Sequence, residues 1–403
     1  MRFSTSPGPG LALRYVRQFF RNTAPIRTVF RYWKRNKFGV KADKKRGDGI
    51  SGPPTGISIN LTRRCNLRCA MCIQHRQDAA PEDLITYDPK RELPLDGWLD
   101  LIDQVAPFRP QIHITGGEPT LYNGYLELIE ACRKHGLSVL FQTNALRLEP
   151  IAQDLVDLGV TQVSTSIDGP PEHHNAIRGR KDAFDKTCAG IRALIKARKK
   201  SRKPGPVTII NTVISKENLQ VLDQMVPITA SLGADVQQFL HTIFNSRPNI
   251  DKHNKLFSQS FANKHNFSII EPSIPDGEFY ESQILPEDIP PLLTTLEAIK
   301  AQAKQYKTPV LYFPNLPSNL IEPYYLDLDY PFGQECNSPW KMAKLMPDGS
   351  LSPCLHVMAG NIRDTPFPDL WNNQAMQGLR KLISKRLFPG CARCGSRNCL
   401  GVF

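Results

Sequence analysis

The stretch ISINLTRRCNLRCAMC spans residues 57–72. Its first five residues alternate apolar and polar side chains, which predicts a half-buried strand over 57–61. The loop that follows spaces Cys65, Cys69 and Cys72 as Cys-x3-Cys-x2-Cys. Three thiolates are one fewer than a 4Fe–4S cluster needs, so this loop would leave one iron open to a substrate or cofactor. A catalytic zinc ion keeps an open position by the same logic, and zinc is therefore the alternative metal.

A strand–helix alternation continues from this stretch to about residue 243. Such an alternation favours a parallel sheet with helices outside it. Six units fit a partial barrel or a doubly wound sheet, and we predict an α/β fold, a partial (β/α)6 TIM-type barrel. The predicted strands cover 57–61, 111–115, 138–143, 162–167, 207–214 and 236–240, and the predicted helices lie near 95–106, 122–135, 149–158, 183–200 and 217–232.

Polar and glycine-rich motifs follow several of these strands. The second strand runs into GGEP, whose two glycines let a ligand approach the backbone closely. After the fourth strand comes Arg178, whose planar guanidinium suits a carboxylate; a surface ion pair is the alternative reading. Ligands of barrel enzymes gather at the carboxyl ends of the strands. The glycine and polar residues of these motifs and strand ends, called here the candidate binding residues, are Gly116, Gly117, Glu118, Ser166, Arg178 and Asn211.

Taken together, these motifs resemble the radical S-adenosylmethionine (SAM) superfamily. The resemblance implies that Cys65, Cys69 and Cys72 hold a catalytic 4Fe–4S cluster, whose open iron binds SAM. It also implies that reductive cleavage of SAM gives a 5′-deoxyadenosyl radical, which abstracts hydrogen from a substrate. The six candidate binding residues above would then position SAM. The family usually has an aromatic residue just before the third cysteine, where this chain has Met71.

A second cysteine group lies near the C-terminus. Pro-Asp-Gly at 347–349 stands between apolar alternations and predicts a hairpin that brings the chain back on itself. Four thiolates can complete a cluster, and zinc is again the alternative. The group resembles the SPASM/twitch extension, and its low cysteine count implies the form with one auxiliary 4Fe–4S cluster. Its proposed ligands are Cys336, Cys354, Cys391 and Cys394, with Cys399 left without a role.

The N-terminal segment carries most of the net charge. Residues 1–48 hold thirteen Lys and Arg against two Asp, so the rest of the chain is nearly neutral and nucleic acid is an unlikely partner. Apolar residues recur at helical spacing among the cations, as in helices that lie on membrane surfaces. The alternatives are that this arm packs on the barrel or is an organellar transit peptide. Residues 41–54 are expected to form a flexible linker.

These observations define four predicted segments, one main hypothesis and two alternatives. The segments are a basic arm and linker (1–54), the core barrel (55–243), an insert with a connecting helix and strand (244–329) and the auxiliary-cluster domain (330–403). We expect a radical SAM enzyme whose unidentified substrate is a lipid or an envelope glycan, reduced by a flavodoxin or ferredoxin. With no membrane span or secretion signal, we expect it in the cytoplasm, at the inner membrane face if the arm attaches there. The alternatives are a maturase of a ribosomally made peptide and a zinc-bearing, non-enzymatic nucleic-acid-binding protein.

Overall fold

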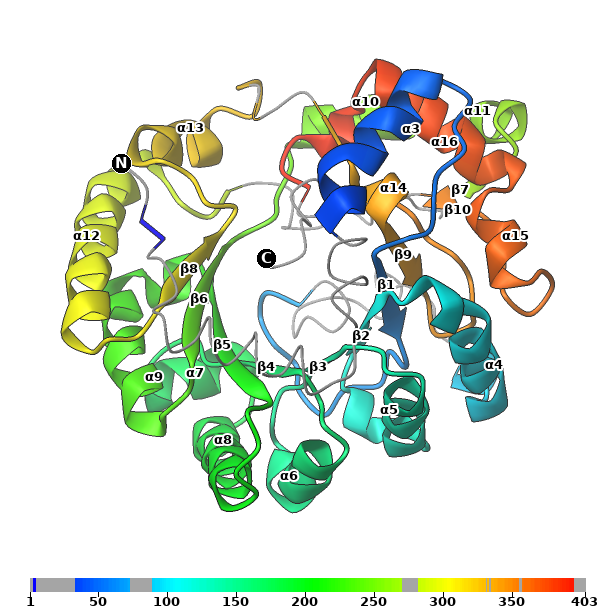
Figure 1. The fold of residues 1–403 in the computed structure, drawn as a ribbon. Helices are drawn as coiled ribbons and strands as arrows, with labels where there is room; N and C mark the ends of the chain where they lie inside the picture. The colour runs from blue at the N-terminus through cyan, green and yellow to red at the C-terminus, as the bar shows by residue number, and fades with distance from the viewer. Residues whose placement is uncertain are drawn as a thin grey trace.

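A curved parallel sheet with helices on its outer side forms the centre of the molecule (Figure 1). The computed structural model describes residues 3–4, 33–72, 89–269, 282–330, 332, 335–354 and 357–394. The sheet has eight strands in the order β8-β6-β5-β4-β3-β2-β1-β9. Within the described ranges its two edge strands do not pair with each other, so the barrel is open. The predicted partial barrel is therefore confirmed.

The six predicted strands lie within one residue of their expected bounds. They pair in sequence order, each parallel to the next. The strands are β1 (Gly56–Asn60), β2 (Gln111–Thr115), β3 (Val139–Gln142), β4 (Gln162–Ser166), β5 (Val207–Ile214) and β6 (Val236–His241). The helices that cover them are α4 (Leu95–Val105), α5 (Tyr125–Lys134), α6 (Leu148–Asp157), α7 (Pro171–Arg178), α8 (Ala183–Lys200) and α9 (Met225–Leu232).

Two further strands extend the sheet beyond the six that were assigned to the barrel. Strand β8 (Val310–Phe313) follows α12 (Ile289–Gln305) and pairs in parallel with β6. Strand β9 (Met342–Leu345) comes from the C-terminal cysteine region and pairs in parallel with β1. The connecting segment and the C-terminal domain thus both complete the barrel wall, because each offers a short strand to an otherwise exposed sheet edge.

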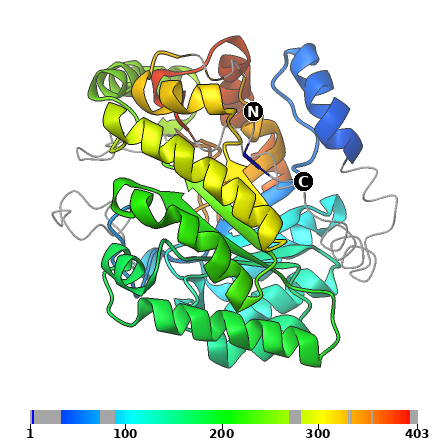
Figure 2. The same cartoon turned by 90° about the vertical axis from the view of Figure 1, so that its left-hand side faces the viewer.

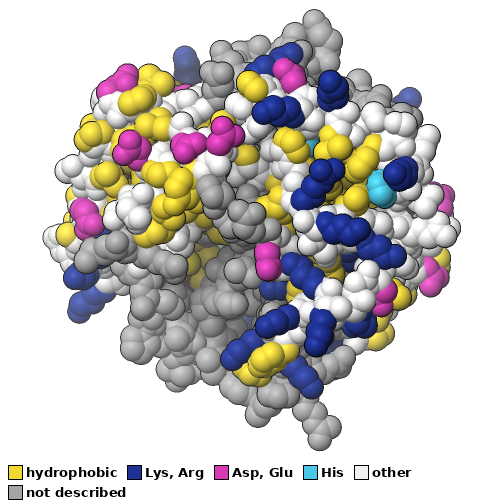
Figure 3. Space-filling view, turned by 90° about the horizontal axis from the view of Figure 1, so that it is seen from above, with side chains coloured by type: hydrophobic (Ala, Val, Ile, Leu, Met, Phe, Trp, Pro, Cys, Tyr) yellow, Lys and Arg dark blue, Asp and Glu magenta, His cyan; other side chains and the backbone are white. Residues whose placement is uncertain are grey.

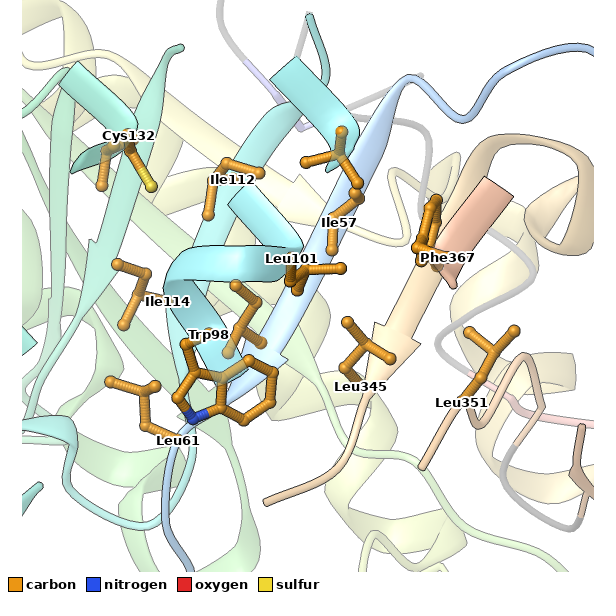
Figure 4. Packing of buried hydrophobic residues seen from close by; sticks show 14 of the residues in the cluster. Ile57, Leu61, Trp98, Leu101, Ile112, Ile114, Cys132, Leu345, Leu351 and Phe367 are labelled. Carbon is orange, nitrogen blue, oxygen red and sulfur yellow. The ribbon is translucent and has the colours of Figure 1, made fainter. Parts of the chain in front are cut away.

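The barrel and the C-terminal domain share one hydrophobic core. Trp98 and Leu101 of α4 are fully buried against the outer face of the sheet. Leu345 and Phe367 of the C-terminal region belong to the same cluster (Figure 4). Burying a side chain of this size stabilises the fold by about 1.5–3 kcal/mol, so this joint core fixes the C-terminal domain on the barrel.

Residues 35–52 of the N-terminal segment are packed against the C-terminal domain. Residues 41–46, expected to be linker, belong to helix α3 (Val40–Arg46), which follows a π-helical turn, η1 (Arg35–Gly39). The backbone after α3 is held by side chains of the C-terminal domain: Arg380 donates to the Gly49 carbonyl (3.1 Å) and Trp371 donates to the Gly52 carbonyl (2.9 Å). The prediction of a flexible linker is therefore wrong, because these hydrogen bonds order the polar segment.

Most residues of the arm's amphipathic stretches lie outside the described residues. After residues 3–4, the described part of the chain begins again at residue 33. Near the N-terminus, Phe3 is 2% exposed and contacts Tyr312 of β8 edge to face. The Ser4 hydroxyl accepts a hydrogen bond from the Tyr312 amide (3.0 Å). Both views place the N-terminus beside α12 (Figures 1 and 2). The start of the chain thus packs on the barrel.

The described part of the predicted insert is helical. Helix α10 (Arg247–Leu256) begins at Ser246, whose hydroxyl accepts from the Asn249 amide, and α11 (Gln259–Lys264) follows. The short strand β7 (Ser268–Ile269) pairs antiparallel with β10 (Val357–Met358). Other helices are α13 (Ile321–Leu326), α14 (Ser338–Lys341), α15 (Phe367–Trp371) and α16 (Gln374–Lys385). None of the helices in the described ranges is both long and apolar enough to cross a membrane.

The predicted C-terminal hairpin is confirmed. Met346 donates its amide to the Ser350 carbonyl (2.9 Å), and Gly349 donates to the Met346 carbonyl (2.9 Å). Gly349 has φ of +88°, a left-handed conformation that favours glycine. Antiparallel bridging of Leu345 with Leu351 continues the hairpin towards Cys354.

Candidate active site

The three-cysteine loop leaves the carboxyl end of β1. Leu67 is buried and anchors the loop, and the Ala70 amide donates to the Ile177 carbonyl of α7 (2.9 Å). Cys69 is 8% exposed, while Cys65 and Cys72 are half-buried. Burial raises the pKa of the Cys65 thiol to about 11, a backbone hydrogen bond from Leu67 opposes the shift, and Glu118 adds to it. A bound cation would therefore favour the thiolate form of Cys65.

The GGEP segment packs directly against this loop. The Gly117 amide donates to the Thr62 carbonyl (2.7 Å), and the Glu118 amide donates to the Arg64 carbonyl (2.8 Å). A Cβ on Gly116 would overlap the Thr62 carbonyl oxygen, and one on Gly117 would overlap the carbonyls just before Cys65. The sequence predicted that a ligand would approach the backbone closely at these glycines. In the structure, the backbone of the cysteine loop makes this close approach.

Glu118 joins the ends of β2 and β3. Its fully buried carboxylate accepts from the amide and hydroxyl of Thr120 (3.1 and 2.8 Å), the Thr143 hydroxyl (2.8 Å) and the Asn144 amide (2.7 Å). Burial raises the pKa of Glu118, and these hydrogen bonds oppose the shift. Glu118 thereby holds Asn144, whose side-chain nitrogen lies 3.9 Å from the Cys65 sulfur. Asn144 is therefore a site residue in addition to the six candidate binding residues.

Arg178 connects the cysteine loop with β4. Its Nε and Nη2 lie 2.6 and 2.5 Å from Asp168 Oδ2, and its Nη1 lies 3.6 Å from the Cys69 sulfur. Asp168 is fully buried, so this is no surface ion pair. Burial lowers the pKa of Arg178, but Asp168 and the Cys69 thiol outweigh it and keep the guanidinium charged. Asp168 is not among the residues predicted from the sequence; its position two residues after β4 and ten residues before Arg178 was the available signal.

The remaining predicted SAM-binding residues lie side by side. Ser166 ends β4 and pairs in register with Asn211 of β5. Both are half-buried, whereas Thr165 and Thr212 on the opposite faces of their strands are fully buried. Adjacent residues on a strand point to opposite faces, so Ser166 and Asn211 face the barrel interior. The structure therefore brings all the predicted SAM-binding residues to the carboxyl end of the barrel.

A hollow of about 370 Å³ lies beside the cysteine loop. It is lined by Cys65, Asn66, Leu67, Arg68, Gly179 and Arg180. Two cationic side chains thus border the hollow together with Cys65. Within the described ranges, no group of three or more Cys, His, Asp or Glu side chains is arranged as a ready-made metal site. Assignment of cluster ligands accordingly rests on the loop and on the donors that face its sulfurs.

The second cysteine group lies in an apolar setting. Cys336 and Cys391 are buried in the joint core, and Cys354 packs against it. The Cys394 amide donates to the Cys391 carbonyl (3.3 Å), so these two residues share one turn at η10 (Pro389–Cys391). Cys399 lies outside the described residues. Thiols with this degree of burial fit a cluster better than an exposed reactive role.

Two family models match this chain. The radical SAM superfamily model matches residues 59–226, and the model described as an iron–sulfur cluster-binding domain, SPASM, matches residues 336–395. The chain belongs to the radical SAM superfamily. A radical SAM domain uses a 4Fe–4S cluster and SAM, and a SPASM domain binds auxiliary iron–sulfur clusters. The alternative of a zinc-bearing, non-enzymatic protein is therefore wrong.

Two curated relatives match along most of their length. An "AdoMet-dependent heme synthase" of Methanosarcina barkeri is 27% identical over 360 residues, covering 86% of this chain and 89% of that protein. A "tungsten-containing aldehyde ferredoxin oxidoreductase cofactor-modifying protein" of Pyrococcus furiosus is 23% identical over 364 residues, covering 85% and 87%. The two relatives are named for different activities.

Solved structures share the fold. Streptococcus suis SuiB superimposes with a TM-score of 0.54 at 16% identity, covering 89% of this chain and 76% of that chain. The structure titled "Native anSMEcpe with bound AdoMet and Cp18Cys peptide" gives a TM-score of 0.54 at 19% identity, covering 85% and 86%. At these identities the likeness shows the fold alone.

Proposed function

We propose that the chain holds a catalytic 4Fe–4S cluster through Cys65, Cys69 and Cys72 and uses SAM to abstract hydrogen from a substrate in the barrel. The observation that carries this proposal is the meeting of the cysteine loop with Asn144 and Arg178, whose nitrogens lie 3.9 and 3.6 Å from two of its sulfurs. Hydrogen bonds from donors of this kind stabilise thiolate sulfur. When bound, the cluster and SAM supply a 5′-deoxyadenosyl radical.

The chain's own residues fix where that chemistry takes place. Gly116 and Gly117 let the second strand turn against the cysteine loop, and Glu118 sets the position of Asn144. Ser166 and Asn211 offer hydrogen-bonding side chains to SAM from adjacent strands. Arg178 places a positive charge between Asp168 and Cys69, on the side where we place the SAM carboxylate.

We also infer one auxiliary 4Fe–4S cluster held by Cys336, Cys354, Cys391 and Cys394. The support is their common place in the C-terminal domain and the burial of Cys336 and Cys391. That cluster would accept the electron left on the substrate or relay electrons inward. Radical SAM enzymes generally need a reductant such as flavodoxin or ferredoxin.

For the substrate we propose a lipid or an envelope glycan that the enzyme meets at a membrane surface. Trp33 and Phe38 are 45% and 50% exposed beside the lysines of η1 and α3. Figure 3 shows Lys and Arg side chains gathered on the right-hand side of the face that carries α3. Exposed aromatic rings among cations are typical of segments that bind anionic membrane surfaces.

A haem precursor is the second candidate substrate. It is favoured by the match to the heme synthase, which extends over 89% of that protein. A second relative of similar coverage is named "Fe-coproporphyrin III synthase". Fe-coproporphyrin III is therefore a defined probe for this alternative.

The test is to reconstitute the protein anaerobically, reduce it in the presence of SAM and measure 5′-deoxyadenosine. Parallel samples receive host membranes, soluble extract or Fe-coproporphyrin III. We expect stimulation by the membranes, while stimulation only by the porphyrin selects the second candidate. Absence of 5′-deoxyadenosine in every sample, from protein with a full iron complement, would overturn the proposed function.

A further inference from the structure

Three adjacent strands present polar side chains at one level of the barrel interior. Ser58 of β1 pairs in register with Lys344 of β9 on one side and with His113 of β2 on the other. These three side chains are half-buried. Their strand neighbours, such as Ile57 and Leu345, are fully buried on the other face of the sheet against α4 (Figure 4). Because strand residues alternate between faces, Ser58, His113 and Lys344 point into the barrel.

His113 is held in place and is neutral at physiological pH. The Ser58 hydroxyl lies 3.4 Å from His113 Nδ1, and Gln142 Oε1 lies 3.2 Å from His113 Nε2. Since a carbonyl oxygen can only accept, this arrangement places the ring proton on Nε2. Burial lowers the pKa of His113 to about 4, the hydrogen bond to Gln142 opposes the shift, and the charge of Lys344 adds to it. His113 thus orients the Ser58 hydroxyl without adding charge.

Lys344 is the charged member of this set. Its ammonium has no hydrogen-bond or ion-pair partner among the described residues. The nearby interior side chains Ser58, Asn60, His113 and Gln142 are all neutral. The two buried carboxylates close to the cysteine loop are already engaged, Asp168 by Arg178 and Glu118 by four donors. A half-buried ammonium therefore faces the interior without a counter-charge among the described residues, and a bound anion would supply one.

We propose that the Lys344 ammonium binds a carboxylate group of the substrate, with the neutral residues Ser58 and His113 as its neighbours. The charge favours this chemistry, because one ammonium balances one carboxylate, whereas a phosphate monoester carries about −1.5 to −2 at neutral pH. A strand rises about 3.3 Å per residue, so Ser58 lies about 7 Å below the end of β1. A substrate held there by its carboxylate extends towards the cysteine loop.

This assignment rests on the proposed function and restricts its substrate to a compound that carries a carboxylate group. It also gives the C-terminal domain a second role. Strand β9 belongs to that domain and supplies Lys344 to the barrel interior. The domain therefore contributes to substrate binding as well as carrying the auxiliary cysteines.

The test uses a small carboxylate and its neutral isostere as probes. Binding of 4-fluorobutyrate and of 4-fluorobutyramide to the reconstituted, SAM-loaded enzyme is followed by fluorine NMR. The variants are Lys344→Gln, which removes the charge, Lys344→Arg, which keeps it, and Ser58→Ala. The matched control is Lys381→Gln on the exposed face of α16. Iron content and melting temperature are measured for each variant to exclude misfolding.

We expect the wild-type enzyme and Lys381→Gln to bind the carboxylate and not the amide. Lys344→Gln should weaken carboxylate binding at least ten-fold and Lys344→Arg should weaken it less. Ser58→Ala should change it by less than about two-fold, because the Ser58 hydroxyl donates its only proton to His113 Nδ1. Equal binding of acid and amide, no binding to the wild type, or unchanged binding to Lys344→Gln would overturn the assignment. Preferential displacement of the probe by inorganic phosphate would also contradict it.

The same wild-type sample separates this inference from the proposed function. Formation of 5′-deoxyadenosine from SAM is measured alongside probe binding. If the wild type forms 5′-deoxyadenosine but fails the probe test, the carboxylate site is wrong and the radical SAM assignment stands. If it binds the probe through Lys344 but forms no 5′-deoxyadenosine, the proposed function is wrong and the anion site stands.

Discussion

The two cysteine groups of this chain are held in opposite ways. The loop at 65–72 is surrounded by backbone hydrogen bonds from β2 and α7, with Asn144 and Arg178 facing its sulfurs. The C-terminal group instead lies in the apolar core that α16 shares with the barrel. Polar contacts with the barrel thus determine the shape of the first site. Hydrophobic packing determines the shape of the second site. Replacing a cysteine of the first group should therefore affect chemistry most, whereas replacing a cysteine of the second should affect iron content and stability.

The largest expected effect comes from Cys69→Ala. Cys69 is the buried cysteine of the loop and the one that Arg178 faces. Loss of this ligand should reduce 5′-deoxyadenosine formation to background while the melting temperature changes little. The matched control is Cys132→Ala, which removes a buried thiol from α5 far from either group in sequence. Retained SAM cleavage by Cys69→Ala would contradict the assignment of the first site.

Glu118→Ala should have the largest effect on stability. It leaves the buried donors of Thr120, Thr143 and Asn144 without their acceptor. Each unsatisfied donor costs about 1–3 kcal/mol, so we expect a loss of at least about 3 kcal/mol in the free energy of unfolding. Anaerobic urea denaturation measures it. Glu130→Ala, on the surface of α5, should change stability by less than about 0.5 kcal/mol; similar effects of the two substitutions would disprove the role of Glu118.

Cys391→Ala tests the second cysteine group separately from the first. It should lower the iron content by about half, because one of two four-iron clusters is lost. Truncating a buried side chain should also lower the unfolding free energy by about 1 kcal/mol. Cleavage of SAM without substrate should persist, since the first loop is shaped by the barrel. An unchanged iron content, determined by chemical analysis, would place the auxiliary cluster elsewhere.

The smallest expected effect concerns pH and comes from His241, the last residue of β6. Burial lowers the pKa of His241 to about 3, and its Nδ1 lies 2.7 Å from the Tyr325 hydroxyl. The unfolded chain takes up a proton near pH 6.5 that the folded protein does not. Stability therefore falls as the pH drops below about 6.5, by at most about 1.4 kcal/mol per pH unit from this residue.

His241→Gln should flatten this pH dependence. Denaturation curves between pH 7 and pH 5 measure the slope for the variant and for the wild type. His135→Gln, at an exposed position near Asp103, is the control and should leave the slope from His241 intact. A slope that His241→Gln does not alter would show that the buried imidazole contributes nothing.

Much of the fold was predictable because its strands have regular apolar patterns and recognisable motifs follow several of them. The six core strands and the hairpin at Gly349 follow directly from local pattern. Strands β8 and β9 were harder to place, since each has only four residues and its partner is set by tertiary packing. The polar residues of α3 indicated a linker, and only long-range hydrogen bonds such as Arg380 to Gly49 give them order.

The cysteines of the candidate site were predictable from the sequence, but the residues that surround and position them were less so. Spacing identifies Cys65, Cys69 and Cys72, but no spacing predicts that Asp168 pairs with Arg178. Lys344 could not be placed either, because its position in the barrel depends on β9 joining β1. By contrast, the Ser246 cap before α10 was a readable signal that the insert contains a helix.

The most direct test is the electron paramagnetic resonance spectrum of the reduced protein with and without SAM. The wild type and Cys391→Ala should both show a spectral change when SAM is added, and Cys69→Ala should show none. This result would place SAM binding at the barrel loop, as the polar contacts of Asn144 and Arg178 indicate. A SAM-dependent change that survives in Cys69→Ala and disappears in Cys391→Ala would contradict the account, because SAM would then bind at the C-terminal cysteines.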